Sequence, residues 1–301
     1  MKKIGLLVVL MLILLVFCSC TEKNVKKEGQ INVVSSFYPM YIATANIVDG
    51  VEDVNLVNLT SQTTGCLHDY QITTQDMIKL TDADILVING NGMENFIDKA
   101  MATYTDLKII NASKDLKEHH EEEHHEVDGH DHGDNSHYWV SISLYMEQIK
   151  NIKDELCKLD EKNKEKYEIN ASIYLNKLEE LKQKMHSELD GFENKNIVTF
   201  HEAFDYFAEE FDLNIVSVIE REPGTYPSSK DVADIINEIK SKDVKAIFVE
   251  PQYSRTAAET IARETSINVY TLDPVVTGEL NKDAYIKIMN ENLETLKKAL
   301  S

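Results

Sequence analysis

Asp84-Ile85-Leu86-Val87-Ile88 is an apolar run behind one acidic residue, with no polar residue alternating inside it. Such a run predicts a strand that is buried on both faces of a sheet. Similar runs in the first half of the chain lie at 31–36, 54–59 and 107–110. Helical patterns lie between and after them, at 38–48, from Asp76 onward, at 94–101 and at 142–159. This alternation predicts a parallel sheet covered by helices.

The second half of the chain repeats this alternation. Strands are predicted at 197–200, 215–219, 246–249 and 267–272. Helices are predicted at 203–211, 229–241, 255–265 and 283–300, and Ser228 or Ser229 is the expected N-cap of the second of these. A second lobe of the same kind is therefore expected.

Between the halves lies 161–189, a stretch without glycine or proline that is rich in lysine, glutamate and leucine. Ile173, Leu178, Leu181 and Met185 recur there at helical spacing. A single helix of this length would span about 40 Å. We predict an α/β fold of two similar lobes, each a four-stranded parallel sheet with flanking helices, joined by one long rigid helix. The cleft between the lobes is the expected ligand site.

The N-terminus has the features of an export sequence. Lys2 and Lys3 precede an apolar run at 5–17, which is shorter than the roughly 20 residues that span a bilayer. Cys20 follows Ser19 as in the lipobox of bacterial lipoproteins, so lipidation of Cys20 is expected; the alternative is an ordinary cleavage site with an incidental cysteine. The expected organisation is a signal peptide at 1–19, a lipidated tether at 20–30, an N-terminal lobe at 31–160, the linking helix at 161–190 and a C-terminal lobe at 191–301.

Charge and cysteine content exclude some classes of protein. The net charge is −21, and loss of Lys2 and Lys3 with the signal peptide makes it −23. Nucleic acid is therefore excluded as a partner, whereas cations would be attracted. Beyond the N-terminal segment only Cys66 and Cys157 remain, which do not make a disulfide framework, and Cys157 is expected to be buried in a helix.

Four residues occupy equivalent places in the two lobes. His68, His137, His201 and Asp273 each lie in a loop that follows a predicted strand. Ligands of open α/β sheets bind outside the carboxyl ends of the strands, so these four side chains could converge on the cleft. Three neutral imidazoles and one carboxylate suit a tetrahedral Zn²⁺ site, whereas Mn²⁺ favours more oxygen ligands.

Several short segments together resemble one protein family. They are Ser35-Ser36-Phe37-Tyr38-Pro39, Cys66-Leu67-His68-Asp69-Tyr70-Gln71, Asn135-Ser136-His137-Tyr138-Trp139, Thr199-Phe200-His201-Glu202-Ala203-Phe204-Asp205-Tyr206-Phe207, Glu250-Pro251-Gln252-Tyr253 and Thr271-Leu272-Asp273-Pro274. In this combination the chain is similar to the zinc/manganese-type solute-binding lipoproteins of bacterial ABC transporters, over essentially the whole mature length.

The resemblance implies a metal site and partners. It implies that His68, His137, His201 and Asp273 are the metal ligands, and histidine at the third position resembles the zinc members. It also implies a monomer on the extracytoplasmic face of the bacterial membrane, held by a lipid anchor, that delivers Zn²⁺ to an ABC permease and its ATPase. Mn²⁺ transport within the same family is the alternative.

The chain departs from the family pattern around the ligands. Cys66-Leu67 stands where the family has Asp-Pro, Ser136 replaces a proline, and Gln71 replaces a glutamate. Cys66 is therefore an alternative thiolate ligand. Asp273 as fourth ligand competes with Glu202 or a water molecule.

A histidine-rich acidic loop is expected within 117–136. Positions 118–132 hold six histidines and seven acidic residues, a composition that cannot form a packed core. Its histidines, which could form a secondary metal site, are His119, His120, His124, His125, His130 and His132. A collector of metal for the cleft is the interpretation we favour over a merely solvated loop.

We expect a binding protein rather than an enzyme, because four protein ligands would leave no open position for activating water. A secreted zinc hydrolase is the alternative from another class. It would need a general base such as Glu202, and the chain has no His-Glu-x-x-His motif. An adhesin is a third interpretation, which no sequence feature favours specifically.

Overall fold

The computed structural model describes residues 29–62, 67, 70–97, 104–116, 135–220 and 227–301. The chain from Ile31 to Ser301 forms one compact unit. Cys20, Cys66, His68 and the histidines of the 118–132 segment lie outside the described residues. No helix within the described ranges is long and apolar enough to cross a membrane.

The first sheet contains four parallel strands in the order β2-β1-β3-β4. The strands are β1 (Ile31–Ser35), β2 (Val54–Asn58), β3 (Ile85–Ile88) and β4 (Lys108–Asn111). Among the described residues of this half, α2 (Tyr38–Ile47), α3 (Thr74–Thr81) and α5 (Ile142–Leu159) are helices with described bounds, and a short 3₁₀ turn, η1 (Tyr138–Val140), precedes α5. The apolar run at 84–88 is thus an inner strand, as predicted.

The second sheet repeats the same order, β6-β5-β7-β8, again fully parallel. Its strands are β5 (Asn196–Thr199), β6 (Asn214–Val218), β7 (Ala246–Val249) and β8 (Asn268–Thr271). Its helices are α7 (Asp205–Glu210), α8 (Ser229–Ser241), α9 (Thr256–Thr265) and α10 (Ala284–Leu300). In each sheet the strand order reverses beside the first strand, which is where open α/β sheets bind ligands.

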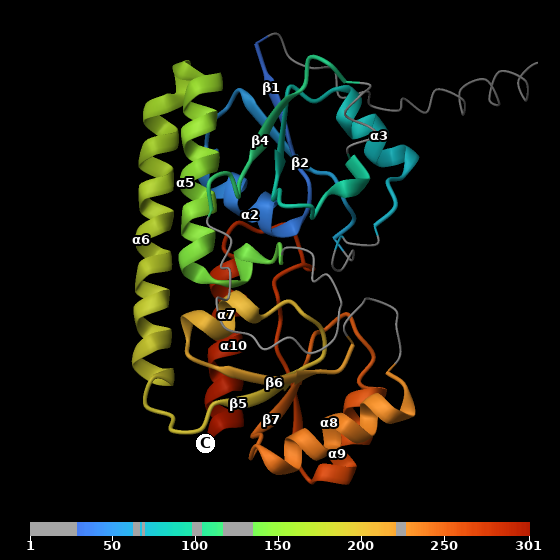
Figure 1. Ribbon diagram of the computed structural model, residues 1–301. Helices are drawn as coiled ribbons and strands as arrows, with labels where there is room; N and C mark the ends of the chain where they lie inside the picture. The colour runs from blue at the N-terminus through green and yellow to red at the C-terminus, as the bar shows by residue number, and fades with distance from the viewer. Residues whose placement is uncertain (1–28, 63–66, 68–69, 98–103, 117–134, 221–226) are drawn as a thin grey trace, which may run out of the picture. The chain divides into compact units, whose positions relative to one another are not determined.

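A single long helix joins the halves, which confirms the predicted connector. The 3₁₀ turn η2 (Glu161–Asn163) leads into α6 (Lys164–Leu189), which runs beside α5 in Figure 1. Because α6 packs on α2 and α5 from the first half and on α10 from the second, it contacts both lobes. Ile173 was expected on its buried face, but is 53% exposed. The buried face of α6 passes through Tyr174, the next residue, so Ile173 points away from that face.

In the part of the chain that the structure describes, the apolar side chains form three clusters. One continuous cluster includes Val33 of β1, Leu178 of α6 and Phe248 of β7, so it passes from one lobe through the connector to the other. Two smaller clusters cover the opposite sheet faces, one including Leu80 of α3 and the other Ile235 of α8. The layers explain why inner strands such as β7 are buried along their whole length.

Local details agree with the predictions at most positions. Ser228 caps α8 in a capping box with Asp231, and Cys157 is a buried free cysteine in α5. The helix expected at 203–211 is shorter, because the Ala203 N–H turns back to the carbonyl of His201 before α7 begins. Of the helix expected at 94–101, the described part is helical only at 95–97.

Candidate metal centre

His201 lies two residues beyond the end of β5, at the carboxyl edge of the second sheet. It is only 3% exposed, and its Nδ1 atom lies 3.3 Å from Oε2 of Glu250. Glu250 follows β7 directly, and β7 is the neighbour of β5 in the sheet. Two adjacent parallel strands therefore deliver an imidazole and a carboxylate to the same point, as the rule for open α/β sheets requires.

His137 comes from the first half of the chain, in the loop before η1, and is also 3% exposed. Its Nδ1 atom lies 2.8 Å from Oδ1 of Asn135, and its backbone N–H donates to the same oxygen at 3.0 Å. The amide orientation of Asn135 is fixed because its Nδ2 donates to Asp205 at 2.6 Å. Since Oδ1 can only accept, Nδ1 of His137 carries the proton.

The structure brings these two histidines together. The rings of His137 and His201 are 5.2 Å apart between centroids and stand at 81° to each other. Trp139 lies beside the first ring at 5.2 Å and Tyr253 beside the second at 5.6 Å. Nδ1 of His137 is hydrogen-bonded to Asn135, and Nδ1 of His201 lies within ion-pair distance of Glu250, although that geometry is not that of a hydrogen bond. Nε2 is then the nitrogen of each ring that is left to bind a metal ion.

Asp273 follows β8, and the side chain of Asn292 holds its backbone in place. Its N–H donates to Oδ1 of Asn292 at 2.9 Å, and its carbonyl accepts from Nδ2 of the same side chain at 2.8 Å. The Val275 N–H donates to the Asp273 carboxylate at 2.8 Å. Burial raises the pKa of Asp273 to about 6, with smaller contributions from the charges of Glu291 and Glu250. A nearby cation favours the ionised form of a carboxylate that burial makes costly to ionise.

His68 lies outside the described residues, but two residues that precede it in the sequence, Leu67 and Gln62, are described. The preceding Leu67 is 1% exposed and belongs to the same apolar cluster as Trp139 and Leu272, which flank the other predicted ligands. The carbonyl of Gln62, earlier in the same loop, accepts from the Gly278 N–H at 3.1 Å. Gln62, six positions before His68 in the sequence, is therefore tied to the segment that follows Asp273.

Of the four predicted ligands, the structure thus places His137 and His201 in mutual contact and Asp273 at the same edge of the second sheet. Within the described ranges, no three histidine, cysteine, aspartate or glutamate side chains are close enough to hold a metal ion together. Glu202, the alternative ligand, is half-buried beside His201. Cys66 and the six histidines of the acidic segment lie outside the part of the chain that is described.

Sequence reasoning missed two residues at this site. Asn135 and Glu250 both lie in segments that resemble the family, but their sequence context predicted no role for either side chain. Glu250 could have been found, because it stands directly after a strand at the same edge as His201. The role of Asn135 could not be predicted from the sequence in this way, because its partner Asp205 is 70 positions away.

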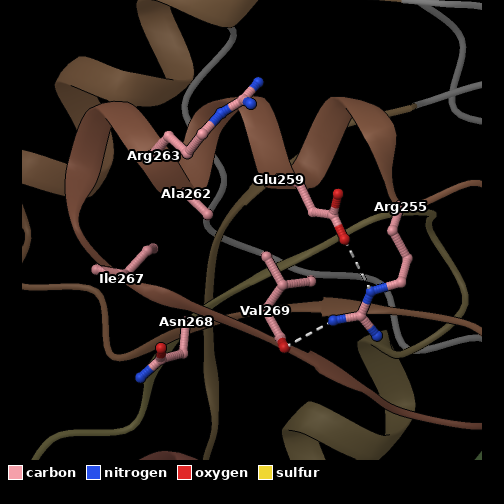
Figure 2. A pocket seen from close by; sticks show the side chains of 7 residues that line it. All are labelled: Arg255, Glu259, Ala262, Arg263, Ile267, Asn268 and Val269. Atoms are coloured by element: carbon pink, nitrogen blue, oxygen red, sulfur yellow. Dashed lines mark hydrogen bonds and ion pairs between the residues drawn. The ribbon is translucent and has the colours of Figure 1, made fainter.

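A surface hollow exists elsewhere in the molecule. Figure 2 shows it between α9 and the edge strand β8, where Arg255 donates to the carbonyl of Val269 at 2.9 Å and pairs with Glu259 at 3.5 Å. Arg255 and Arg263 both line it. Two guanidinium groups would repel a metal ion, and Arg255 covers an otherwise open strand edge. We assign this hollow no part in metal binding.

Comparison with known proteins gives one consistent family. The family model described as "Zinc-uptake complex component A periplasmic" matches residues 33–299. The high-affinity zinc uptake system protein ZnuA of Bacillus subtilis is 34% identical, over 98% of this chain and 97% of that protein. The zinc-binding lipoprotein AdcA of Streptococcus pneumoniae is 30% identical over 99% of this chain, which spans only 61% of that relative's length.

Solved structures agree with the fold. The solute-binding protein FpvC of Pseudomonas aeruginosa, in complex with Mn²⁺, superposes with a TM-score of 0.78 at 27% identity, covering 90% of this chain and 98% of that one. The laminin-binding protein Lmb of Streptococcus agalactiae, described as bifunctional with adhesin and metal transporting activity, gives 0.77 at 27% identity, covering 90% and 100%. Both likenesses extend over the two lobes and the connector.

Proposed function

Because the chain belongs to the family of the periplasmic zinc-uptake complex component A, we propose that it captures Zn²⁺ outside the cytoplasm and delivers it to an ABC-type uptake permease and its ATPase. The observation that carries this proposal is the buried pair of His137 and His201, whose rings lie 5.2 Å apart with each Nδ1 facing an oxygen. Two imidazoles presented through Nε2 form half of a tetrahedral zinc site.

The remaining two ligands are His68 and Asp273. Asp273 supplies a buried carboxylate. Its pKa is raised to about 6, so its ionised form is disfavoured by burial and would be stabilised by a nearby cation. His68 follows the buried Leu67, which shares the apolar cluster of the site. With three imidazoles and one carboxylate the coordination sphere is closed, so this protein carries zinc without catalysing a reaction.

The parts of the chain outside the described residues complete the proposal. Cys20 anchors the mature chain, a monomer, to the outer face of the membrane through lipid. The histidines of the 118–132 segment collect Zn²⁺ at lower affinity. Cys66 is an alternative ligand, as is Glu202 within the described residues, and the domain boundaries remain those proposed from the sequence.

Mn²⁺ is the second candidate cargo, because one similar solute-binding structure is described with Mn²⁺ bound. The donor set argues against it: Mn²⁺ favours carboxylate, carbonyl and water oxygens, whereas imidazole suits Zn²⁺. His201 contributes the nitrogen that decides between the two.

The test is a competitive titration of the metal-free chain 21–301 with Zn²⁺ and Mn²⁺. We expect one tight Zn²⁺ site that excess Mn²⁺ does not fill, together with weaker sites that vanish when 118–132 is deleted. His201→Ala should remove the tight site. His186→Ala is the control and should leave the site intact, because His186 is a partly exposed residue in the last turn of α6. Tight Mn²⁺ binding that resists Zn²⁺, or no tight site, would overturn the proposal.

A further inference from the structure

We propose that Glu250 is a positioning residue of the metal centre, whose carboxylate holds the Nδ1 proton of His201 and so directs Nε2 to the metal ion. This inference rests on the proposed function. Glu250 touches no cargo in this scheme; it acts through His201. No role for Glu250 follows from the ligand set inferred from the sequence.

The geometry carries the inference first. Oε2 of Glu250 lies 3.3 Å from Nδ1 of His201, which is within ion-pair distance although the geometry is not that of a hydrogen bond. The two side chains are 0% and 4% exposed, so a small rotation of either inside the buried site would complete the hydrogen bond. His201 lies just beyond the end of β5, and Glu250 lies just beyond the end of β7. These two strands are hydrogen-bonded neighbours in the sheet. The distance between the two side chains is therefore set by the sheet rather than by a free loop.

The turn after β7 holds the backbone at Glu250. The Tyr253 N–H donates to the Glu250 carbonyl at 3.2 Å, closing a tight turn through Pro251. The Tyr253 ring then lies 5.6 Å from the ring of His201 between centroids. One four-residue turn thus contacts the same imidazole through a carboxylate and through an aromatic ring. This supports a role in orienting His201.

Charge distinguishes this contact from the one at His137. There the acceptor is the neutral amide of Asn135, at 2.8 Å from Nδ1. At His201 it is a buried carboxylate, which is costly to bury unless positive charge lies close by. A carboxylate behind a metal-binding imidazole orients the ring and raises the basicity of the nitrogen that binds the metal. Loss of such partners typically weakens metal binding by about 10–100-fold.

The experiment compares Glu250→Gln with the wild-type chain 21–301. The substitution keeps the size of the side chain and an oxygen acceptor, but removes the charge. We expect the Zn²⁺ dissociation constant, measured against a competing chelator, to rise by about 10–100-fold. Asp160→Asn is the matched control: Asp160 is another buried carboxylate, 7% exposed, that accepts from Tyr167 at the α5–α6 junction. It should leave zinc affinity unchanged.

A second readout does not depend on zinc. Nitrogen-15 NMR of the metal-free wild-type chain, at about pH 8.5 and thus about two units above the ordinary pKa of histidine, should show His201 with its proton on Nδ1. Glu250→Gln should shift the population toward the Nε2–H form. Because the wild-type spectrum alone tests the contact, a variant that fails to fold would not leave the inference untested.

Three outcomes would overturn the inference. One is a wild-type His201 protonated on Nε2. Another is an unchanged zinc affinity in Glu250→Gln. The third is a changed visible spectrum of bound Co²⁺ in that variant, since a change in coordination would make Glu250 a ligand. Failure of the proposed function looks different: the wild-type chain would not bind Zn²⁺ tightly, while the Nδ1–H form of His201 would still be observed.

Discussion

The carboxylate of Glu210 accepts the backbone N–H of Ile142 at 2.7 Å, so the last residue of α7 caps the first turn of α5. The same carboxylate accepts from the Ser141 hydroxyl at 2.8 Å and from both the N–H and the hydroxyl of Ser143, at 3.0 and 2.6 Å. α7 begins four residues after His201, and α5 begins five residues after His137. A single side chain therefore connects the segments that carry the two histidines.

Glu210→Ala should destabilise the protein, because it removes a negative charge from a helix N-terminus and leaves several donors without their acceptor. We expect a loss of about 1–3 kcal/mol in the free energy of unfolding, measured by urea denaturation of the metal-free chain. Glu168→Ala is the control, since Glu168 is an exposed residue of α6 that only approaches Lys164 at 3.9 Å. Equal stability of the two variants would show that the cap contributes nothing.

Glu94 provides a pH dependence with a defined sign. Burial raises its pKa to about 7, although the Ser36 hydroxyl and the backbone N–H groups of Asn89 and Gly90 donate to it at 2.7, 2.7 and 3.0 Å. The unfolded chain should titrate Glu94 near its ordinary value of about 4.3. The folded state thus holds the proton more tightly, so the contribution of Glu94 to stability is full below about pH 4 and is lost as the pH rises toward 7.

The check is the difference in unfolding free energy between wild type and Glu94→Gln, followed from about pH 4 to pH 8. This difference should shift by roughly 3–4 kcal/mol in favour of the variant as the pH rises, since one unit of pKa corresponds to about 1.4 kcal/mol. Comparison at each pH cancels the titration of groups that the substitution leaves untouched. Parallel curves would contradict the prediction.

Much of the fold follows from local patterns in the sequence. The apolar run at 84–88 became an inner strand, and the stretch at 161–189 without glycine or proline became α6 with its initial 3₁₀ turn. These features depend on residues within one element. Ile173 shows the limit of such reasoning, because apolar residues one position apart compete for the buried face, and Tyr174 takes it through packing with residues distant in sequence.

The site is predictable to a different extent. The positions of His201 and Asp273 just beyond strand ends follow from the α/β pattern alone, because parallel strands bring their carboxyl ends to one edge. His137 lies in the loop before η1, 26 positions after the end of β4. The partners that orient these side chains do not follow from the pattern. Asn135 donates to Asp205, 70 positions away in the sequence, and Trp139 donates to the carbonyl of Pro274, 135 positions away. Neither contact produces a periodic pattern in the sequence.

Asn135 and Asp205 give the third prediction, a coupling between lobes at the ligand His137. Asp205 accepts from Asn135 at 2.6 Å, and Asn135 in turn holds His137. Asp205→Ala and Asn135→Ala should each weaken Zn²⁺ binding, the second by up to about tenfold, and the double variant should be no weaker than Asn135→Ala alone. Fully additive losses in a chelator competition assay would show that Asp205 does not act through Asn135. Asp212→Ala, on the same lobe and highly exposed, is the control.

The fourth prediction concerns the segment between Asp273 and α10, where Gly278 has a φ of +148°. A Cβ atom there would stand 2.6 Å from Oη of Tyr38, a contact that real structures do not tolerate. That hydroxyl is itself engaged, donating to the carbonyl of Glu279 at 2.7 Å, so it cannot move without losing its partner. Gly278→Ala therefore combines backbone strain with a clash between segments of the two lobes.

We expect Gly278→Ala to lower the free energy of unfolding by about 2–4 kcal/mol. Gly191→Ala is the matched control, because a Cβ atom at Gly191 would meet nothing within 4 Å beyond its chain neighbours, and it should change stability by less than about 1 kcal/mol. The Gly278 N–H also holds the carbonyl of Gln62 at 3.1 Å, in the loop that leads to His68. Displacing this segment should therefore weaken zinc binding as well, whereas full affinity at reduced stability would show that the loop carrying His68 is positioned independently of Gly278.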